Sequence, residues 1–342
     1  MAKEEIGIGI VGTGHIAQIA YLPALKKVEG AKILALCDSE TAKARSLAEK
    51  HGIPRWTTRF EDLLQMEEVK GIVITTPNYL HHPMVLASLE FGKHVLCEKP
   101  IALDRKSVED LVNLSKKTKS ILMPANNFRY RPDAQALKKF VEKGELGEIF
   151  YIKTGWLQRM EDEPVSGWRR EKRQAGGGVL LTYGIHILDL ALWFLEKKEV
   201  LSVNASMHFP SREKGVENGA FVFLKLEGDT TLTLEISWTL LDERDFTYLN
   251  LFGSKGGALL QPLRIQKELH GHLVNVTPKI ESSLVGRNPY KASFELQTEH
   301  FVQSIHKGKE SFPFGEDEVR LAQVIEAAYL SVKNREEVKI VQ

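Results

Sequence analysis

The sequence has few cysteines and no long apolar run, and each shortage excludes a class of protein. Only two cysteines, Cys37 and Cys97, occur among the 342 residues. Two cysteines cannot form a disulfide framework or a zinc site of the usual cysteine-based kind. Because both stand at the ends of apolar runs, we expect buried structural thiols. No apolar stretch reaches about 18 residues without interruption, so we expect no membrane-spanning helix.

An excess of charge of either sign is missing too. The 46 Lys and Arg residues almost cancel the 45 Asp and Glu residues, which leaves a formal net charge of +1. Nucleic-acid binding needs a basic surface, so this balance argues against nucleic acid as a main partner. Residues 1–5 show no apolar core behind a basic segment, so we expect no secretion signal and a cytoplasmic protein. His270 and His272 have no carboxylate or cysteine at ligand spacing, so we expect no metal site.

The chain is long enough for two domains, and its two parts differ in their hydrophobic pattern. In residues 1–125, short apolar runs alternate with helical patterns, which is typical of a parallel sheet covered by helices on both faces. The expected strands are 6–11, 32–37, 71–75, 94–97 and 121–123, and the expected helices are 16–27, 40–51, 60–66, 80–91 and 107–118. We therefore predict an α/β fold whose first domain is a doubly wound parallel sheet.

Residues 126–342 show a different pattern. The expected elements are helices at 134–143, 180–195, 294–307 and 316–334, a strand at 148–154 and a short run at 338–341. Between 200 and 276 the segments look extended and are joined by polar or glycine-containing turns, which indicates a large, mostly antiparallel sheet. The glycine-rich segment 253–257 lacks the spacing of a phosphate-binding loop, so it is interpreted as a turn. This pattern predicts an α+β domain.

The most specific motif follows the first expected strand and leads into a helix. Its sequence is Gly12-Thr13-Gly14-His15-Ile16-Ala17. The first glycine permits a tight turn, the second lets the backbone approach a pyrophosphate, and the small Ala17 lets the helix pack closely on the strand. The helix N-terminus adds positive potential. We predict a Rossmann-type domain that contacts a dinucleotide through residues 12–16.

The end of the second expected strand bears on the choice of dinucleotide. A carboxylate at Asp38 would accept hydrogen bonds from the ribose hydroxyls and repel a 2′-phosphate, which favours NAD. Capping of the next helix is the alternative role of Asp38. Lys43 and Arg45 follow within two turns and would soften the preference, so NADP stays an alternative.

The third and fourth strands also end in polar residues, at the sheet edge where ligands bind in such folds. Thr76, Asn78 and His81 follow the third strand and are predicted cofactor contacts, although His81 also fits a solvent-facing helix start. Glu98 and Lys99 end the fourth strand. Adjacent charges there must serve a site or be solvated, and a partly buried lysine can exchange protons near neutral pH.

Taken together, these segments resemble a known family. The four segments are 12–17, 76–81, Gly92-Lys93-His94-Val95 and Glu98-Lys99-Pro100. They look like the successive signatures of the Gfo/Idh/MocA family of NAD(P)-dependent sugar and cyclitol dehydrogenases, and the resemblance extends over nearly the whole chain. It implies that Lys99 is the catalytic acid/base, and Glu98 and Lys99 are also predicted cofactor contacts. It also implies a special turn at Pro100, with a cis peptide bond as one form.

The resemblance further implies a substrate pocket in the second domain. Arg129, in the segment 127–132, would lie near the substrate or the nicotinamide, and Trp168-Arg169 would belong to the pocket. A surface salt bridge is the alternative for both arginines.

The expected helix 180–195 carries the remaining candidates. Thr182, His186, Asp189 and Trp193 recur at i, i+4, i+7 and i+11, so they share one helix face. The neighbouring residues are apolar, so polar groups there need partners or a function. The family frequently has an aspartate where Thr182 stands, and a threonine cannot act as a general base near neutral pH. The proton chemistry therefore falls on Lys99 and His186, while Asp189 orients His186 or, as we favour, ties the helix to its neighbours.

These observations predict hydride transfer between a nicotinamide and a carbon bearing a secondary hydroxyl of a sugar, cyclitol or related polyol. The predicted substrate residues are Arg129, Trp168, Arg169, Thr182, Tyr183 and His186. Two alternatives are an NAD-dependent glycosidase of the same fold and a non-catalytic NAD(P)-binding regulator. Phe221 and Phe223, or the residues that alternate with them, are expected on the outer face of the second sheet, which favours a homodimer or homotetramer.

Overall fold

The computed structural model describes residues 5–159, 167–196, 198–210, 215–280, 288–308 and 314–340. These residues form two compact units. The first contains Met1–Asn127 and Tyr290–Val319, and the second contains Phe128–Pro289 and Arg320–Gln342. Sequence reasoning places 290–319 in the second domain. The structure assigns this segment to the first unit because α9 (Pro289–Lys307) buries Phe301 next to Gly71 of the parallel sheet.

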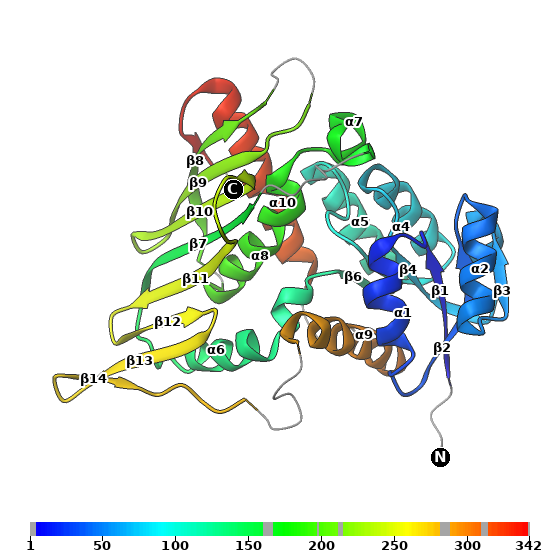
Figure 1. Ribbon diagram of the computed structural model, residues 1–342, viewed down its shortest axis with the longest axis horizontal. Helices are drawn as coiled ribbons and strands as arrows, with labels where there is room; N and C mark the ends of the chain where they lie inside the picture. The colour runs from blue at the N-terminus through cyan, green and yellow to red at the C-terminus, as the bar shows by residue number, and fades with distance from the viewer. Residues whose placement is uncertain are drawn as a thin grey trace. The chain divides into compact units, whose positions relative to one another are not determined.

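A six-stranded parallel sheet forms the centre of the first unit, with the order β3-β2-β1-β4-β5-β6 (Figure 1). The strands are β1 (Ile6–Val11), β2 (Ala31–Cys37), β3 (Arg55–Thr57), β4 (Val69–Ile74), β5 (His94–Cys97) and β6 (Leu122–Pro124). The predicted doubly wound sheet is confirmed. Sequence reasoning misses only β3, because this three-residue edge strand has no apolar run.

The helices of the first unit mostly begin and end where sequence signals place them. They are α2 (Thr41–His51), α3 (Phe60–Gln65), the 3₁₀ turn η2 (Asn78–Leu80), α4 (His81–Glu90), α5 (Arg105–Thr118) and α9. Asp104 caps α5 by accepting a hydrogen bond from the Ser107 amide at 2.8 Å. The left-handed Gly52 (φ 67°) ends α2.

The first helix differs from the regular α-helix expected at 16–27. A π-helical turn, η1 (Ala17–Tyr21), leads into the short α1 (Leu22–Leu25). Pro23 has no N–H to give to the carbonyl four residues earlier, and its ring crowds that carbonyl. A wider turn before the proline accommodates this local mismatch.

Both cysteines are buried free thiols, as predicted. Burial, followed by the charge of Asp38, raises the pKa of Cys37 to about 12. Burial also raises the pKa of Cys97 well above its usual value. Both side chains therefore stay protonated and act as small apolar groups.

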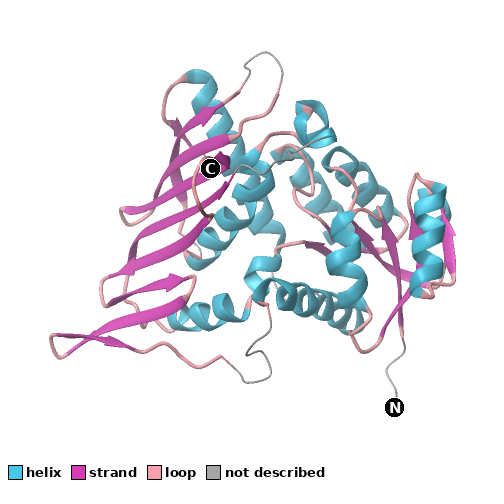
Figure 2. Cartoon of the chain, viewed as in Figure 1, coloured by secondary structure: helices cyan, strands magenta, loops and turns pink. Residues whose placement is uncertain are grey.

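The second unit is built on a nine-stranded sheet, whose order is β14-β13-β12-β11-β7-β10-β9-β8-β15, and Figure 2 draws its strands in magenta. Its strands are β7 (Ile149–Arg159), β8 (Val200–His208), β9 (Gly219–Leu226), β10 (Thr230–Leu240), β11 (Phe246–Gly253), β12 (Gly256–Leu260), β13 (Leu263–Leu269), β14 (His272–Asn275) and β15 (Val338–Lys339). Only β7 and β10 pair in parallel, so the predicted mostly antiparallel sheet is confirmed. Of the expected run 338–341, Val341 lies outside the described residues.

Helices cover the inner face of this sheet. They are α6 (Pro132–Glu142), the π-helical η5 (Leu180–Gly184), α8 (Ile185–Phe194) and the part of α10 (Phe314–Asn334) that belongs to this unit, while the short α7 (Lys172–Ala175) packs on the turn before it rather than on the sheet. Along β9 and β10 every second side chain is buried against them. Lys172–Phe194 is long and apolar enough to cross a membrane, but 78% of its most apolar window is buried inside the protein. Buried core helices commonly reach this length and apolar composition.

Three further expectations concern the outer face and the turns of this sheet. Phe221 and Phe223 are 54% and 40% exposed, so these two side chains rather than their alternates lie on the outer face. The glycine-rich segment 253–257 is the turn between β11 and β12, as interpreted. His270 lies in the turn between β13 and β14, whereas His272 is the first residue of β14.

Candidate functional site

The turn after β1 has one glycine that the fold requires and one that it does not. Gly12 has φ +83°, and a Cβ there would lie 2.8 Å from the Thr75 carbonyl carbon and oxygen. Gly14 is different, since a Cβ at this position would meet no protein atom within 4 Å. The missing side chain at Gly14 thus keeps space open above the backbone, which is what a pyrophosphate approaching the turn needs. The turn fits a dinucleotide.

Asp38, at the end of β2, is tied directly to this turn. One carboxylate oxygen accepts hydrogen bonds from the Thr13 amide and hydroxyl, both at 2.7 Å, and the other accepts from the Glu40 amide at 3.0 Å. Burial acts to raise the pKa of Asp38, but these hydrogen bonds and nearby Lys43 outweigh it and lower the pKa. The side chain is therefore a carboxylate at neutral pH, and it contacts the helix start as well as the turn.

The end of β4 holds the predicted residues Thr76, Asn78 and His81. Asn78 is buried, and the buried His81 ring bridges two backbone carbonyls: Nε2 lies 2.8 Å from Thr76 O and Nδ1 lies 2.7 Å from Pro100 O. Burial lowers the pKa of His81. His81 therefore braces the turn that carries Lys99, and a contact with a cofactor stays a prediction.

Glu98 and Lys99 follow β5 at the same edge of the sheet. The Glu98 carboxylate accepts hydrogen bonds from the Tyr21 hydroxyl at 2.7 Å and from the Lys99 amide at 3.2 Å. Burial raises the pKa of Glu98, while these contacts act in the opposite direction. The Lys99–Pro100 peptide bond is cis. Because β1, β2, β4 and β5 are neighbours and parallel, their carboxyl ends bring the glycine turn, Asp38, Asn78 and Lys99 to one edge of the sheet.

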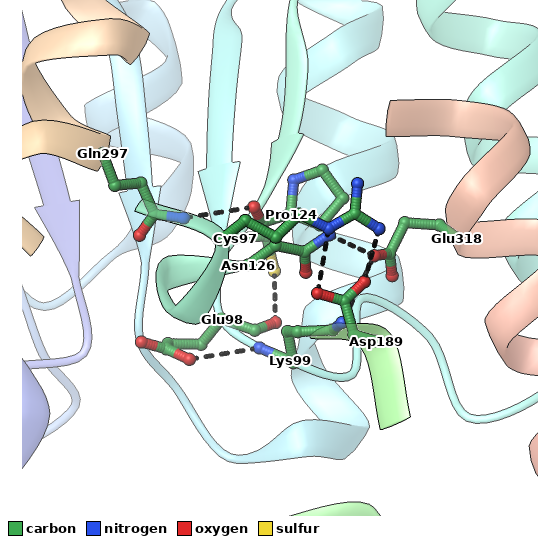
Figure 3. A network of polar contacts seen from close by, with 9 residues as sticks. Cys97, Glu98, Lys99, Pro124, Asn126, Asp189, Gln297 and Glu318 are labelled. Carbon is green, nitrogen blue, oxygen red and sulfur yellow. Dashed lines mark hydrogen bonds and ion pairs between the residues drawn. The ribbon is translucent and has the colours of Figure 1, made fainter. Parts of the chain in front are cut away.

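Sequence reasoning misses the acidic partner of Lys99. Glu318 of α10 places Oε1 3.3 Å from Lys99 Nζ, and both side chains are almost fully buried, at 4% and 0% exposure. The same oxygen accepts a hydrogen bond from Asn126 Nδ2 at 2.8 Å. Figure 3 shows Lys99, Asn126 and Glu318 in this network. A charge on an amphipathic helix far along the chain gives no signal that it faces inward.

In the second unit, His186 belongs to a row of aromatic rings. Its ring stacks on Phe128 at 5.4 Å, Phe128 stacks on Trp156 at 5.8 Å, and Trp156 stacks on Tyr183 at 4.6 Å. Trp238 meets Tyr183 edge-on at 6.1 Å. Except for Phe128, these rings are only partly buried. Such a row offers flat apolar surface beside an imidazole, and Trp156 and Trp238 come from the ends of the two parallel strands, which sequence reasoning does not detect.

The polar residues that sequence reasoning groups with His186 have other partners. Arg129 and Asp189 form a buried bidentate ion pair, with Nε–Oδ2 3.0 Å and Nη2–Oδ1 2.6 Å. Asp189 thus ties α8 to the segment before α6, the structural role that we favour. The Thr182 hydroxyl donates to the Gly178 carbonyl at 2.9 Å, so it is left to accept, rather than donate, a further hydrogen bond.

The glycines before this helix have a structural reason. A Cβ on Gly177 would lie 1.9 Å from the Tyr329 hydroxyl, and one on Gly178 would lie 1.9 Å from the Glu217 carbonyl oxygen. The buried Glu217 carboxylate accepts hydrogen bonds from the Gly178 and Leu180 amides and from Tyr329. The glycine run therefore lets Glu217 cap the helix.

Trp168 and Arg169 lie on the 3₁₀ turn η4 (Gly167–Arg170). The Arg169 guanidinium stands 4.6 Å from the centre of the Trp168 ring, a cation–π distance. Among the described residues, no group of three or more His, Cys, Asp or Glu side chains is arranged to hold a metal ion.

Two family models match this chain. Residues 6–126 match an oxidoreductase family with an NAD-binding Rossmann fold, and residues 134–259 match the Gfo/Idh/MocA C-terminal domain. The chain belongs to the Gfo/Idh/MocA family. It is an oxidoreductase whose cofactor is NAD, bound by the Rossmann domain described above.

Relatives and solved structures support the same placement. The chain is 28% identical over 315 residues to D-glucoside 3-dehydrogenase of Escherichia coli (strain K12), covering 88% of this chain and 89% of that protein. It is 28% identical over 213 residues to levoglucosan dehydrogenase of Pseudarthrobacter phenanthrenivorans, covering 60% of this chain and 54% of that protein. A levoglucosan dehydrogenase structure in complex with NADH and levoglucosan has the same fold, with a TM-score of 0.90 at 20% identity over 99% of this chain and all of that chain.

Proposed function

We propose that this Gfo/Idh/MocA protein oxidises a secondary ring hydroxyl of a sugar or closely related polyol with NAD, and reduces the corresponding ketone in reverse. One observation carries the proposal: a buried lysine ends β5 at the sheet edge that also holds the glycine turn and Asp38. The names of two relatives, a glucoside dehydrogenase and a levoglucosan dehydrogenase, support a pyranose ring as the substrate.

The cofactor would be held by residues of the first unit. The backbone around Gly14 would take the pyrophosphate, and the Asp38 carboxylate would accept hydrogen bonds from ribose hydroxyls. Bound NAD supplies the hydride acceptor for oxidation. Since the Asp38 pKa is lowered, its negative charge would disfavour the 2′-phosphate of NADP.

Lys99 would handle the proton of the reacting hydroxyl. In oxidation its neutral amine takes the proton from the oxygen as the C–H bond breaks, and in reduction its ammonium returns that proton. The positive charge also stabilises the alkoxide that develops on the same oxygen.

His186 would hydrogen-bond the same substrate oxygen, with its ring orientation fixed by stacking on Phe128. The partly buried rings of Trp156 and Tyr183 would lie against the apolar C–H face of the sugar. Arg169 and Trp168 would border this pocket. Arg129 would act indirectly, because its guanidinium is hydrogen-bonded to Asp189 of the helix that carries His186.

Replacement of Lys99 tests the function directly. The assay is NADH formation with levoglucosan, methyl glucosides and inositols, each with NAD and with NADP. Lys99→Met is expected to lower kcat/KM by about 10²- to 10⁴-fold, the usual contribution of a general acid–base group, with NAD binding weakened far less. Lys70→Met, which removes an exposed lysine of β4, is the matched control.

Three results would contradict the proposal. Near-wild-type turnover by the Lys99 variant would remove the lysine from the mechanism. A flat response of the wild-type protein across the panel, with tight NAD binding, would favour the non-catalytic regulator. Hydrolysis of a glycoside without net NADH release would favour the glycosidase.

We further propose that the protein is cytoplasmic and self-associates through the outer face of its nine-stranded sheet. The exposed Phe221 and Phe223 of β9 support association. Light scattering of the wild-type protein and of the Phe221→Ser/Phe223→Ser variant compares their masses, and identical masses would contradict this surface.

A further inference from the structure

Glu318, the acidic residue that contacts Lys99, comes from a part of the chain that neither family model matches. The models match residues 6–126 and 134–259, whereas Glu318 lies in α10. Its Oε1 atom is 3.3 Å from Lys99 Nζ, and both side chains are almost fully buried. A hydrogen bond of 2.8 Å from Asn126 Nδ2 fixes this oxygen. Burial of a carboxylate is costly unless it has such partners. Contact with Lys99 and Asn126 therefore offsets the cost of burying Glu318.

Glu98, the other carboxylate near Lys99, is occupied differently. It accepts hydrogen bonds from the Tyr21 hydroxyl and from the backbone amide of Lys99, so it holds the turn rather than the ammonium group. Cys97 and Tyr21 are buried near this pair, and burial raises the pKa of each well above its usual value, so both stay protonated across the neutral range. Two charged groups, Lys116 and Glu316, lie beside Glu318 in the lining of a cavity.

Glu318, the contact of Lys99, also borders this cavity. The cavity has a volume of about 150 Å³, and its lining includes Ser115, Lys116, Pro124 and Glu316 together with Glu318. That volume accommodates several water molecules. The Lys99 side chain is itself 0% exposed, so a proton that reaches its amine needs a route to solvent.

We infer that Glu318 is a positioning residue that holds Lys99 and relays its proton to water in this cavity. The inference rests on the proposed acid/base role of Lys99. In oxidation, the substrate proton goes to the amine, the resulting ammonium gives a proton to the Glu318 carboxylate, and the carboxylic acid releases it to water. In reduction the same proton moves in the opposite direction, and Glu318 returns to its starting state in both cases.

The first test needs neither substrate nor cofactor. Lysine is labelled with ¹³C at Cε, the Lys99 signal is assigned by its loss in Lys99→Met, and its chemical shift is followed against pH. Because a carboxylate favours the ammonium form of a neighbouring lysine, Glu318→Gln is expected to move the titration of this signal to lower pH by about 1 to 3 units. Glu326→Gln, which removes an exposed charge from the same helix at a position that does not line the cavity, is expected to leave it in place.

The second test follows turnover of levoglucosan or of another active member of the panel. Glu318→Gln is expected to lower kcat by about 10²-fold, with KM little changed and the pH–rate profile displaced. Glu318→Asp is expected to recover part of the rate. Added formate or acetate supplies a free carboxylate and should raise the rate of Glu318→Ala but not that of Lys99→Met. A purely structural role of Glu318 would give no such rescue.

The two proposals can fail separately. A Lys99→Met variant without activity beside a Glu318→Gln variant with wild-type rate and pH profile would overturn the relay and leave the function standing. If the wild-type protein turns over no member of the panel, the function fails, and the NMR titration still decides the contact. An unchanged Lys99 signal in Glu318→Gln overturns the inference.

Discussion

Removing the carboxylate of Asp189 is expected to destabilise the second unit strongly. Asp189 and Arg129 are 2% and 8% exposed and meet through two hydrogen bonds, of 2.6 and 3.0 Å. At these distances an effective dielectric constant of about 20 gives an attraction of about 6 kcal/mol, part of which offsets desolvation. A single substitution at Asp189 leaves the guanidinium buried without its counter-charge. The free energy of unfolding is then expected to fall by about 3–5 kcal/mol.

The assay is equilibrium denaturation followed by tryptophan fluorescence. The second unit contains Trp156, Trp168, Trp193 and Trp238, four of the five tryptophans, so its unfolding dominates the signal. We expect the free energy of unfolding of Asp189→Asn to fall by about 3 kcal/mol or more, because asparagine keeps one acceptor but no charge.

Two comparisons make the result specific. The double variant Arg129→Met/Asp189→Leu removes both charges, so its free energy of unfolding is expected to lie closer to the wild-type value than that of Asp189→Asn. Lys225→Met breaks an exposed pair with Glu337, at 3.0 Å and with 56% and 40% exposure, and is expected to cost no more than about 1 kcal/mol. An Asp189→Asn protein within about 1 kcal/mol of wild type would refute the assignment of Arg129 to this ion pair and return it to the substrate pocket.

Two further predictions concern the cofactor turn. Gly14→Ala is expected to fold normally, because its methyl group meets no protein atom, and to bind NAD at least about tenfold more weakly, or about 1.4 kcal/mol, because the methyl group occupies space that the pyrophosphate needs. Gly12→Ala, at φ +83° and against Thr75, should instead lower thermal stability. Calorimetric titration with NAD and thermal melting separate the two, and equal loss of stability in both would contradict the distinction. Asp38→Asn is expected to unfold more easily than wild type by about 1 kcal/mol at pH 7, since charge-assisted hydrogen bonds are lost from a half-exposed group. The folded-state pKa of Asp38 lies below the usual 3.8, so this stabilisation is present above pH 3.8 and is lost as the pH falls through the folded-state value; a difference that grows on acidification would show that the pKa shift has the opposite sign.

Most of the first unit follows from local sequence patterns. Strands buried on both faces, such as β1 and β5, appear as continuous apolar runs, and the carboxyl ends of parallel strands always meet at one edge. Those two facts are enough to bring Asp38 and Lys99 to the edge that holds the glycine turn. The edge strand β3 escapes this reasoning because its three residues have no periodic pattern.

The parts that sequence reasoning misses depend on tertiary packing. Nothing in the sequence around Glu318 shows that its carboxylate turns inward while Glu316 stays exposed. In the same way, the helix spacing places Asp189 on the face of His186, but only the fold brings Arg129 to it. Likewise, nothing in the sequence shows that Gly177 and Gly178 lack side chains because Tyr329 and Glu217 occupy that space.

The return of residues 290–319 to the first unit has a consequence for the order in which the protein is made. The six strands leave the ribosome within the first 127 residues, but α9, with the buried Phe301 and with Phe294 packed edge-on against Tyr21 at 5.4 Å, follows only after most of the second unit has been synthesised. A nascent chain therefore lacks the helix that completes this side of the sheet until most of the second unit has been made, so the first unit cannot finish its packing ahead of the second, as N-terminal domains usually do. A fragment that stops near residue 127 would lack α9 altogether, and an isolated cofactor domain would need the two segments joined.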